Sequence, residues 1–111
     1  MVILAMVGTK YDEGKPPLGL LSRLAVEEVG RVLEYGRAKY GSHNWRRGLG
    51  HQRLVSAALR HIFAWNESED NDQDSGLSHL AHAICMLMFA LEEHKLKPEL
   101  DDRWSPCGKT G

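Results

Sequence analysis

The segment from residue 77 to residue 96 most constrains the fold, because its apolar residues recur at helical spacing. They are Leu77, Leu80, Ala81, Ile84, Leu87, Met88 and Leu91. Residues three, four and seven positions apart lie on one face of an α-helix. Pro98 follows at a position where a helix is expected to have ended. The pattern predicts a helix that begins between Asp72 and Leu77 and reaches about Leu96.

Two earlier segments have the same periodicity. The first is expected to begin at Ser22, a suitable N-cap, and to run to about Lys39; the second covers residues 51–66. Three helices with short connections predict one all-α domain over residues 1–98, arranged as a helical bundle. Its first 19 residues form a loop-like arm with a short strand at Val2–Val7. Residues 99–111 are expected to be a poorly ordered, flexible tail.

The second and third predicted helices are apolar over more than one face. A monomer of three helices would have difficulty covering these faces, so the chain is expected to form a homo-oligomer, a dimer or a tetramer. This oligomer would complete a bundle of four or more helices.

Charge and hydropathy exclude several classes of partner. The 111 residues carry a formal net charge of −1, so no overall basic field is available to attract nucleic acid. The apolar start of the chain, Met1 to Val7, is too short to cross a membrane. Two cysteines in such a chain suggest no disulfide framework. A cytoplasmic protein without membrane or nucleic-acid partners is expected.

Five carboxylates crowd the stretch before the third predicted helix: Glu67, Glu69, Asp70, Asp72 and Asp74. They repel one another, so the run is either solvated or holds a cation. If helical geometry extends back to Glu69, this residue shares one stripe with Asp72 and His79. Such carboxylates suit Mg²⁺ or Mn²⁺. Alternatively, the run is a solvated loop in which Asp72, Asp74 or Ser75 caps the helix.

Further candidates lie on the predicted helices. Glu28 occurs among apolar and aromatic residues and needs a partner, which could be Lys39, an arginine of another helix or a cation shared with the acidic run. Glu27 points about 100° away and is either a second ligand or an exposed ion-pair residue. His61, His79 and His82 suit a transition metal or proton transfer. The alternative is that these histidines are hydrogen-bonded core or interface residues.

The segment from residue 39 to residue 48 is rich in groups that recognise nucleotides. Trp45 could stack on a base, and Asn44 could pair with a base edge. Cationic and polar groups that could contact a nucleotide are Lys39, Tyr40, Arg46 and Arg60, with Lys10, Asp12 and Lys15 in the arm. Alternatively, Trp45 fills a gap between helices and the arginines are solvated.

Several of these pieces together resemble the phage and prophage dATP/dGTP diphosphohydrolase family. The shared motifs are Lys10-x-Asp12-x-x-Lys15, Glu28, Tyr35-Gly36-x-x-Lys39-Tyr40-Gly41, Asn44-Trp45-x-x-Gly48, Ala57-Ala58-Leu59-Arg60-His61 and the stretch Glu69 to Ala83. The resemblance covers roughly residues 10–92.

This family is akin to the MazG-like all-α pyrophosphohydrolases, which place Glu-x-x-Glu on one helix and Glu-x-x-Asp on a later one around Mg²⁺. Here Glu69-x-x-Asp72 matches the second half. The first half departs, because Glu27 and Glu28 are followed three positions later by Gly30 and Arg31. A purine preference, and the host cytoplasm as location if the protein is phage-encoded, are implied by the resemblance alone.

The sequence thus predicts Mg²⁺- or Mn²⁺-dependent hydrolysis of dATP or dGTP to the monophosphate and pyrophosphate. The expected metal ligands are Glu28, Glu69 and Asp72, with Glu27 and Asp74 as further candidates. Glu69, Asp72 and His79 are the expected catalytic residues. His61 and His82 join the expected substrate contacts Lys10, Asp12, Lys15, Lys39, Tyr40, Asn44, Trp45, Arg46 and Arg60.

Two alternatives remain. One is a triphosphohydrolase that uses the histidines and a transition metal and releases tripolyphosphate. The other is a non-enzymatic helical interaction module, in which the acidic run is a solvated cap.

Overall fold

The computed structural model describes residue 11 and residues 13–106. Its main elements are α1 (Arg23–Tyr40), α2 (His51–Asn66) and α3 (His79–Leu96), with short 3₁₀ helices at Leu18–Leu20, Asn44–Arg47 and Pro98–Leu100. No strand occurs in these described ranges, so the predicted all-α class is confirmed. The strand expected at Val2–Val7 lies outside them.

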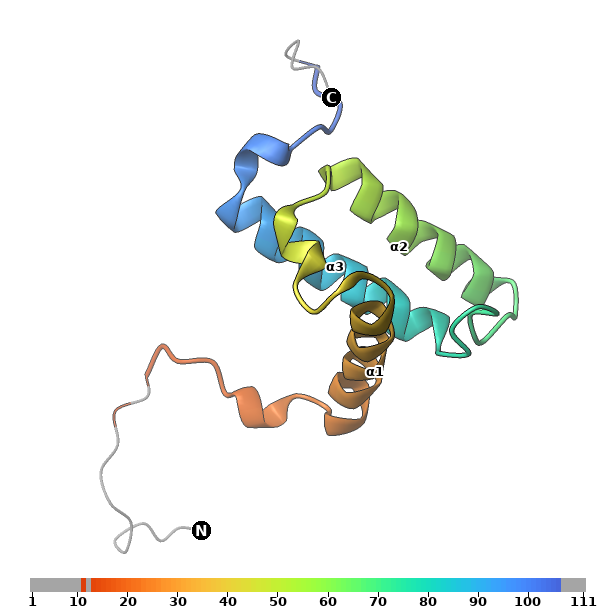
Figure 1. The fold of residues 1–111 in the computed structure, drawn as a ribbon. Coiled ribbons are helices and arrows are strands. Elements are labelled where there is room, and N and C mark those ends of the chain that lie inside the picture. The colour runs from red at the N-terminus through yellow and green to blue at the C-terminus, as the bar shows by residue number, and fades with distance from the viewer. Residues whose placement is uncertain (1–10, 12, 107–111) are drawn as a thin grey trace, which may run out of the picture.

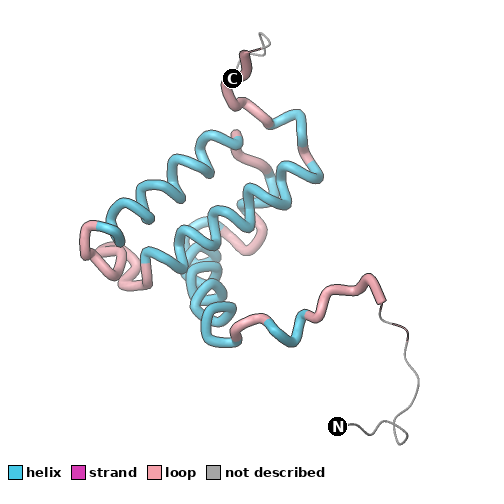
Figure 2. The backbone as a smooth tube through the Cα atoms, turned by 180° about the vertical axis from the view of Figure 1, so that it is seen from behind, coloured by secondary structure: helices cyan, strands magenta, loops and turns pink. Residues whose placement is uncertain are grey.

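The three helices form an antiparallel pair with one crossing helix. Figures 1 and 2 show α2 and α3 running side by side in opposite directions, while α1 crosses α3 at a steep angle. The 3₁₀ helix Asn44–Arg47 joins α1 to α2 and lies close to α3. None of the helices in the described part of the chain is long and apolar enough to cross a membrane.

Local sequence signals set both ends of α1. The Ser22 side chain accepts a hydrogen bond from the Ala25 N–H at 3.1 Å, which satisfies one free donor of the first turn. The helix ends where Gly41 adopts a φ of +96°, a conformation that costs a residue without Cβ little. The prediction for this helix is confirmed to within one residue, and the bounds of α2 match those predicted.

The core is built mainly from small side chains. The buried apolar residues among those described are Val29, Val32, Leu54, Ala58, Ala81, Ala83 and Cys85. Small residues allow α2 and α3 to approach closely, but they bury little apolar area. Much of the apolar stripe predicted for α3 therefore remains at the surface: Leu80, Ile84, Leu87, Met88 and Leu91 are all at least 40% exposed.

The start of α3 differs from the prediction. The helix begins at His79, because the Ser78 hydroxyl accepts hydrogen bonds from the N–H groups of Leu80 and Ala81. Residues 67–78 form a loop instead, so the helical stripe predicted from Glu69 through Asp72 to His79 is wrong. Gly76 explains part of this outcome, since its φ of +72° lies outside helical geometry.

The residues directly after α3 are more structured than the sequence suggested. The 3₁₀ helix Pro98–Leu100 turns the chain back towards the start of α2, as Figure 1 shows. There the Asp102 carboxylate accepts a hydrogen bond from the Gln52 N–H at 2.8 Å. This contact satisfies a free donor in the first turn of α2, where Gly50 provides no side-chain cap.

Candidate metal and nucleotide site

Asp72 organises the loop between α2 and α3. Its Oδ1 accepts hydrogen bonds from the N–H groups of Asp74 and Ser75, both at 2.9 Å. The Asp72 N–H and the Leu77 carbonyl close the loop at 2.8 Å. Partial burial acts to raise the pKa of the Asp72 carboxyl, but the two backbone donors outweigh it and hold the pKa below its usual range. Asp72 is therefore a carboxylate at neutral pH, and no group in the described part of the chain donates a hydrogen bond to its Oδ2.

Three side chains form a hydrogen-bonded chain beside this loop. His79 Nε2 lies 2.8 Å from Glu69 Oε2, and His79 Nδ1 lies 2.8 Å from His61 Nδ1. Because an ionised carboxylate only accepts, His79 donates through Nε2–H. In neutral His79, Nδ1 then carries a lone pair and accepts the proton of His61 Nδ1. The loop, α2 and α3 thus contribute Glu69, His61 and His79 to one polar cluster, although the helical stripe expected from Glu69 to His79 does not form.

His82 links this cluster to α1. Its ring stacks on the His61 ring with centroids 4.4 Å apart, and its Nε2 lies 2.7 Å from the Ser75 hydroxyl. The edge of Tyr35 on α1 faces the same ring. Burial lowers the pKa values of both His61 and His82; the neighbouring histidines lower them further, against the opposing charge of Asp72. Both rings therefore favour the neutral form, which a metal ligand requires.

His61, Asp72 and His79 are the residues of this cluster best placed to hold an ion. One ligand atom from each lies within 4.8 Å of the other two. Two imidazoles and a carboxylate form a mixed nitrogen and oxygen donor set, which suits Mn²⁺ or Zn²⁺ better than Mg²⁺. The two Nδ1 atoms bond directly, so an ion held by both would need them to separate by a few tenths of an ångström.

A cavity of about 380 Å³ between α1, the connecting segment and α3 reaches this cluster at His82. His82 forms part of its wall, and so do Tyr35 and Tyr40 of α1 and Asn44 of the connecting 3₁₀ helix. This volume lies within the usual range of small-molecule sites. Cys85 also lines the cavity, but burial raises the pKa of its thiol to about 11, which makes it a poor nucleophile.

Trp45 lines both this cavity and a second hollow, which extends along Glu27, Arg31 and Glu34 of α1. Its ring stacks on Phe89 of α3, with centroids 4.3 Å apart and planes within 8°. The Arg46 guanidinium covers the ring at 4.3 Å and forms an ion pair with Glu92 at 3.0 Å. Trp45 thus packs between helices, and a base could stack on it only if Arg46 moved away.

The other expected site residues are placed less centrally. Glu28 is half-buried on α1 and has no hydrogen bond or ion pair within the described ranges. Glu27 is exposed and pairs with Arg23 at 2.8 Å. Lys39 is exposed and lies near the Tyr35 and Tyr40 rings; a hydrogen bond to Tyr40 raises the pKa of its ammonium group.

Three further expected residues, Asp74, Arg60 and Lys15, have exposed side chains. Within the described ranges none of these side chains hydrogen-bonds a cluster residue, although the Asp74 backbone N–H donates to Asp72 Oδ1 at 2.9 Å. Lys10 and Asp12 lie outside the described residues. Two useful residues were missed from sequence: Ser75, considered only as a helix cap, hydrogen-bonds His82, and Arg53 lines the cavity.

Comparison with known proteins identifies the family. The family model described as "dATP/dGTP diphosphohydrolase, N-terminal" matches residues 6–103. The chain belongs to this dATP/dGTP diphosphohydrolase N-terminal family. A protein of Salmonella phage PMBT28 named dATP/dGTP diphosphohydrolase is 46% identical over 101 residues, which is 90% of this chain and 34% of the relative. The chain therefore spans about a third of that relative's length. No solved structure matches the chain.

Membership in the dATP/dGTP diphosphohydrolase N-terminal family confirms the resemblance drawn from the motifs. The matched residues include α1, α2, α3 and the loop that carries Asp72. Both the histidine cluster and the cavity thus lie within the family domain.

Proposed function

We propose that this domain binds dATP or dGTP and hydrolyses it, with a divalent ion, to the monophosphate and pyrophosphate. One observation carries the proposal: His82 belongs both to the wall of the 380 Å³ cavity and to the histidine cluster. A nucleoside in the cavity would therefore have its phosphates close to Asp72 and His79. The family name supports the choice of substrate.

Mn²⁺ fits the cluster better than Mg²⁺, because imidazole nitrogens accompany the carboxylate oxygens. His61, Asp72 and His79 would hold the ion, with Glu69 as an additional oxygen ligand or as the partner that orients His79. The bound ion would neutralise phosphate charge and lower the pKa of a bound water. Glu28 remains a candidate ligand from α1 and Glu27 and Asp74 remain secondary candidates.

The residues of the domain have separate tasks in such a reaction. Water attacks the α-phosphorus, the bond to the bridging oxygen breaks, and pyrophosphate leaves. Where His61 and Asp72 hold the ion without His79, the His79 Nδ1 lone pair can accept the proton of the attacking water, and Glu69 fixes the orientation of the ring through Nε2. Tyr35, Tyr40 and Asn44 would contact the nucleoside, while Arg46 and Lys39 would meet phosphates only after leaving their present partners.

A second candidate is the triphosphohydrolase, which would cleave the ester bond and release tripolyphosphate. The grouping of His61 and His79 with Asp72 favours it, since this donor set suits a transition metal. The products distinguish the two reactions, because only the first yields a nucleoside monophosphate.

We also propose that the exposed apolar face of α3 pairs with a second copy of the domain. Six large apolar side chains of α3, with Leu96 at its end included, are exposed to at least 40%, and a patch of this kind is unusual on a monomer. Leu87→Lys should weaken such an oligomer at least about tenfold, since a charge would be buried there. Sedimentation measurements would show this change, with Asn66→Lys as a charge-matched control at an exposed polar position.

The proposed activity is tested by incubating each deoxynucleoside triphosphate with the domain and Mg²⁺ or Mn²⁺, and identifying the products. The variant Asp72→Asn should reduce turnover at least about 100-fold, because metal coordination contributes several kcal/mol to catalysis. Asparagine retains an oxygen that can accept the Asp74 and Ser75 N–H groups, so the loop should fold normally.

Asp70→Asn is the matched control. It removes the same charge from the same loop, but the Asp70 side chain is exposed and makes no hydrogen bond with the other described residues. Equal turnover in Asp72→Asn and Asp70→Asn would rule out Asp72 as a metal ligand. Release of tripolyphosphate from the unmodified domain would show that it is a triphosphohydrolase and not a diphosphohydrolase.

A further inference from the structure

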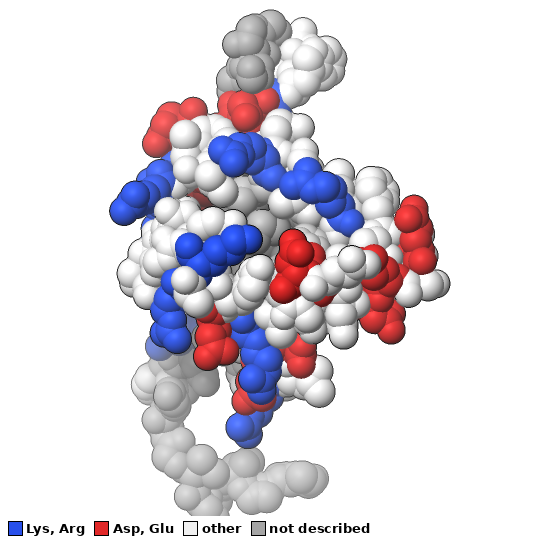
Figure 3. All heavy atoms as spheres, turned by 45° about the vertical axis from the view of Figure 1, so that its right-hand side comes forward, with Lys and Arg blue, Asp and Glu red and all other residues white. Residues whose placement is uncertain are grey.

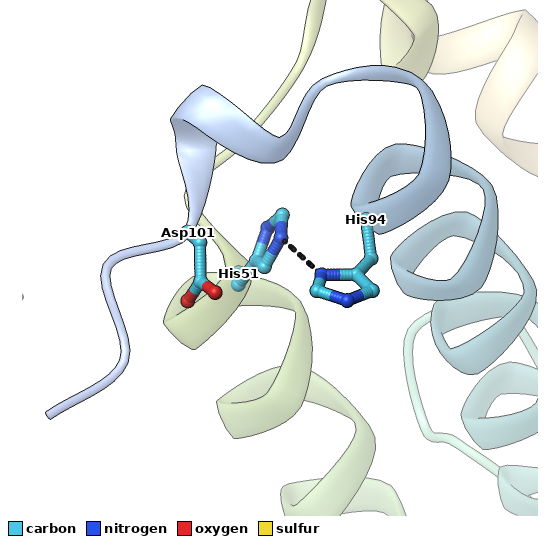
Figure 4. A group of neighbouring side chains, drawn as sticks. All are labelled: His51, His94 and Asp101. Carbon is cyan, nitrogen blue, oxygen red and sulfur yellow. Dashed lines mark hydrogen bonds between the residues drawn. The ribbon is translucent and has the colours of Figure 1, made fainter. Parts of the chain in front are cut away.

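A second group of histidine and carboxylate side chains lies at the opposite end of the α2–α3 pair. His51 is the first residue of α2, His94 lies in the last turn of α3, and Asp101 follows the 3₁₀ helix Pro98–Leu100. Figure 4 shows the two rings facing each other, with the Asp101 carboxylate beside His51. Three separate segments thus bring ligand-type atoms together.

The distances fit one tetrahedral ion. His51 Nε2 lies 3.3 Å from His94 Nδ1, and a ligand atom from each of the three residues lies within 4.8 Å of the others. Two nitrogens bound to the same tetrahedral ion at about 2.0–2.1 Å are about 3.3–3.4 Å apart. The two rings therefore have this spacing already, without any movement of α2 or α3.

Glu93 fixes the orientation of His51. Its Oε2 lies 2.7 Å from His51 Nδ1, its Oε1 accepts the Leu49 N–H at 2.7 Å, and both side chains are almost completely buried. The carboxylate keeps the proton on Nδ1, so Nε2 presents its lone pair towards His94. A carboxylate behind a histidine in this way is the usual outer partner of a metal-binding imidazole.

Asp101 supplies an anionic oxygen. Hydrogen bonds from Arg103, at 2.8 Å to Oδ1 and 2.6 Å to Oδ2, hold the pKa of Asp101 well below its usual range. Oδ1 also accepts the Arg103 backbone N–H at 3.1 Å, so Oδ2 is the oxygen that keeps a lone pair for a ligand bond. The neighbouring Asp102 holds this segment in place through the Gln52 N–H.

We propose that His51, His94 and Asp101 bind a transition-metal ion of the Zn²⁺ class, separate from the proposed catalytic ion. Two imidazoles and one carboxylate are a typical donor set for Zn²⁺. The ion fastens the segment after α3 to the start of α2. His94 is exposed, so the fourth position of the ion faces solvent and takes water.

Co²⁺ is the probe for the test, because its visible absorption reports tetrahedral coordination. The full chain is titrated in excess Mg²⁺, and His94→Ala is compared with Asp72→Asn and with His43→Ala, which removes another exposed histidine. Because the first cluster can also take Co²⁺, His94→Ala and His43→Ala are each combined with Asp72→Asn. We expect the double variant with His94→Ala to lose the tetrahedral absorption and at least about tenfold in Co²⁺ affinity, while Asp72→Asn alone and the double variant with His43→Ala keep both. Absorption that survives in the double variant with His94→Ala, or that is already lost in Asp72→Asn alone, would overturn the proposal.

Glu93→Gln tests the positioning role of Glu93. A glutamine amide that donates to His51 Nδ1 moves the ring proton to Nε2, which can then no longer bind the ion. We expect Co²⁺ affinity to fall by about 10–100-fold and the nitrogen NMR shifts of His51 to report the exchanged tautomer. A tautomer change with unaltered affinity would show that His51 is not a ligand.

Amide hydrogen exchange tests the fastening of the chain segment. The Gln52 N–H donates a hydrogen bond to Asp102. In the unmodified chain, Zn²⁺ should slow the exchange of this N–H with solvent. His94→Ala should abolish this slowing. It should not alter the exchange of the Ala81 N–H, which lies in the first turn of α3 beside His79. Equal slowing in both proteins would contradict a clamp at His94.

Discussion

Two histidine–carboxylate clusters lie at opposite ends of the α2–α3 pair, and they are built differently. In the cluster around His79, the carboxylate partner Glu69 is 43% exposed and belongs to a loop. In the cluster around His51, the partner Glu93 belongs to α3 and only 6% of its side chain is exposed. A cavity reaches the first cluster, whereas the segment after α3 lies against the second, where His94 stays exposed.

This difference suits the first cluster to catalysis and the second to a structural ion that holds the segment after α3 against α2. A substrate needs access and ligands that can adjust, which a loop and a cavity provide. A structural ion needs ligands already held at the correct spacing, which the 3.3 Å between His51 and His94 provides. At the first cluster the corresponding nitrogens are 2.8 Å apart and must separate.

The surface around the two clusters provides no strong electrostatic field of one sign. The face shown in Figure 3 carries both basic and acidic side chains, so neither sign covers it. This agrees with the net charge of −1 over the whole chain. Attraction of a nucleotide is therefore expected to depend on local groups at the cavity.

The largest difference between the clusters should appear on removal of the central histidine. His51→Ala leaves the buried Glu93 without its partner and should lower the free energy of unfolding by about 3 kcal/mol. His79→Ala should cost about 1–2 kcal/mol, since Glu69 can turn to solvent. Urea denaturation measures both values, and equal losses would remove this distinction between the two clusters.

Metal preference should distinguish the clusters next. His61→Gln removes an imidazole donor from the first cluster and should lower the ratio of Mn²⁺- to Mg²⁺-supported turnover by about tenfold. Initial rates in the two metals give this ratio. A ratio that stays constant would mean that His61 contacts substrate or stabilises the fold and does not hold the ion.

Helix capping gives a smaller contrast between the two ends. Ser78→Ala removes the local cap of α3, and Asp102→Ala removes the cap that a distant segment supplies to α2. Each should lower the free energy of unfolding by about 1 kcal/mol. Thermal unfolding measures both, and only Asp102→Ala should also weaken Zn²⁺ stabilisation. Weaker Zn²⁺ stabilisation in Ser78→Ala as well would mean that the two ends are coupled.

The pH dependence of stability should be the smallest effect. The pKa values of His61 and His82 are lowered in the folded state, so the unfolded chain binds protons first as pH falls. Stability should therefore decline below about pH 6.5, by at most about 1.4 kcal/mol per pH unit for each histidine, and level off below the folded pKa values. The loss linked to Asp72 begins only when pH falls below the ordinary pKa of about 3.8, and it is complete once pH has fallen through the depressed folded pKa.

Urea unfolding between pH 7 and pH 5 measures this slope. His82→Gln should make it shallower, whereas His43→Ala, which removes an exposed histidine, should leave it unchanged. An identical slope in His82→Gln would mean that burial of His82 does not control acid stability.

Local pattern alone was enough to predict the all-α class, the bounds of α1 and α2 and the end of α3. Apolar spacing and capping residues act within a few positions along the chain, so they can be read without a structure. The motifs likewise indicated the family, and they singled out His61, Asp72, His79 and His82. The acidic run was a candidate site for the same reason, since its charges are neighbours in sequence.

Only the tertiary structure decided how these groups meet. Asp72 reaches the histidines because its own carboxylate closes a loop that ends at Ser78, not because a helix carries it there. The second cluster was invisible in the sequence, because His51 and Asp101 are brought together by a turn after α3. Contacts between residues 40 to 50 positions apart depend on how helices pack, and periodicity within one helix contains no information about them.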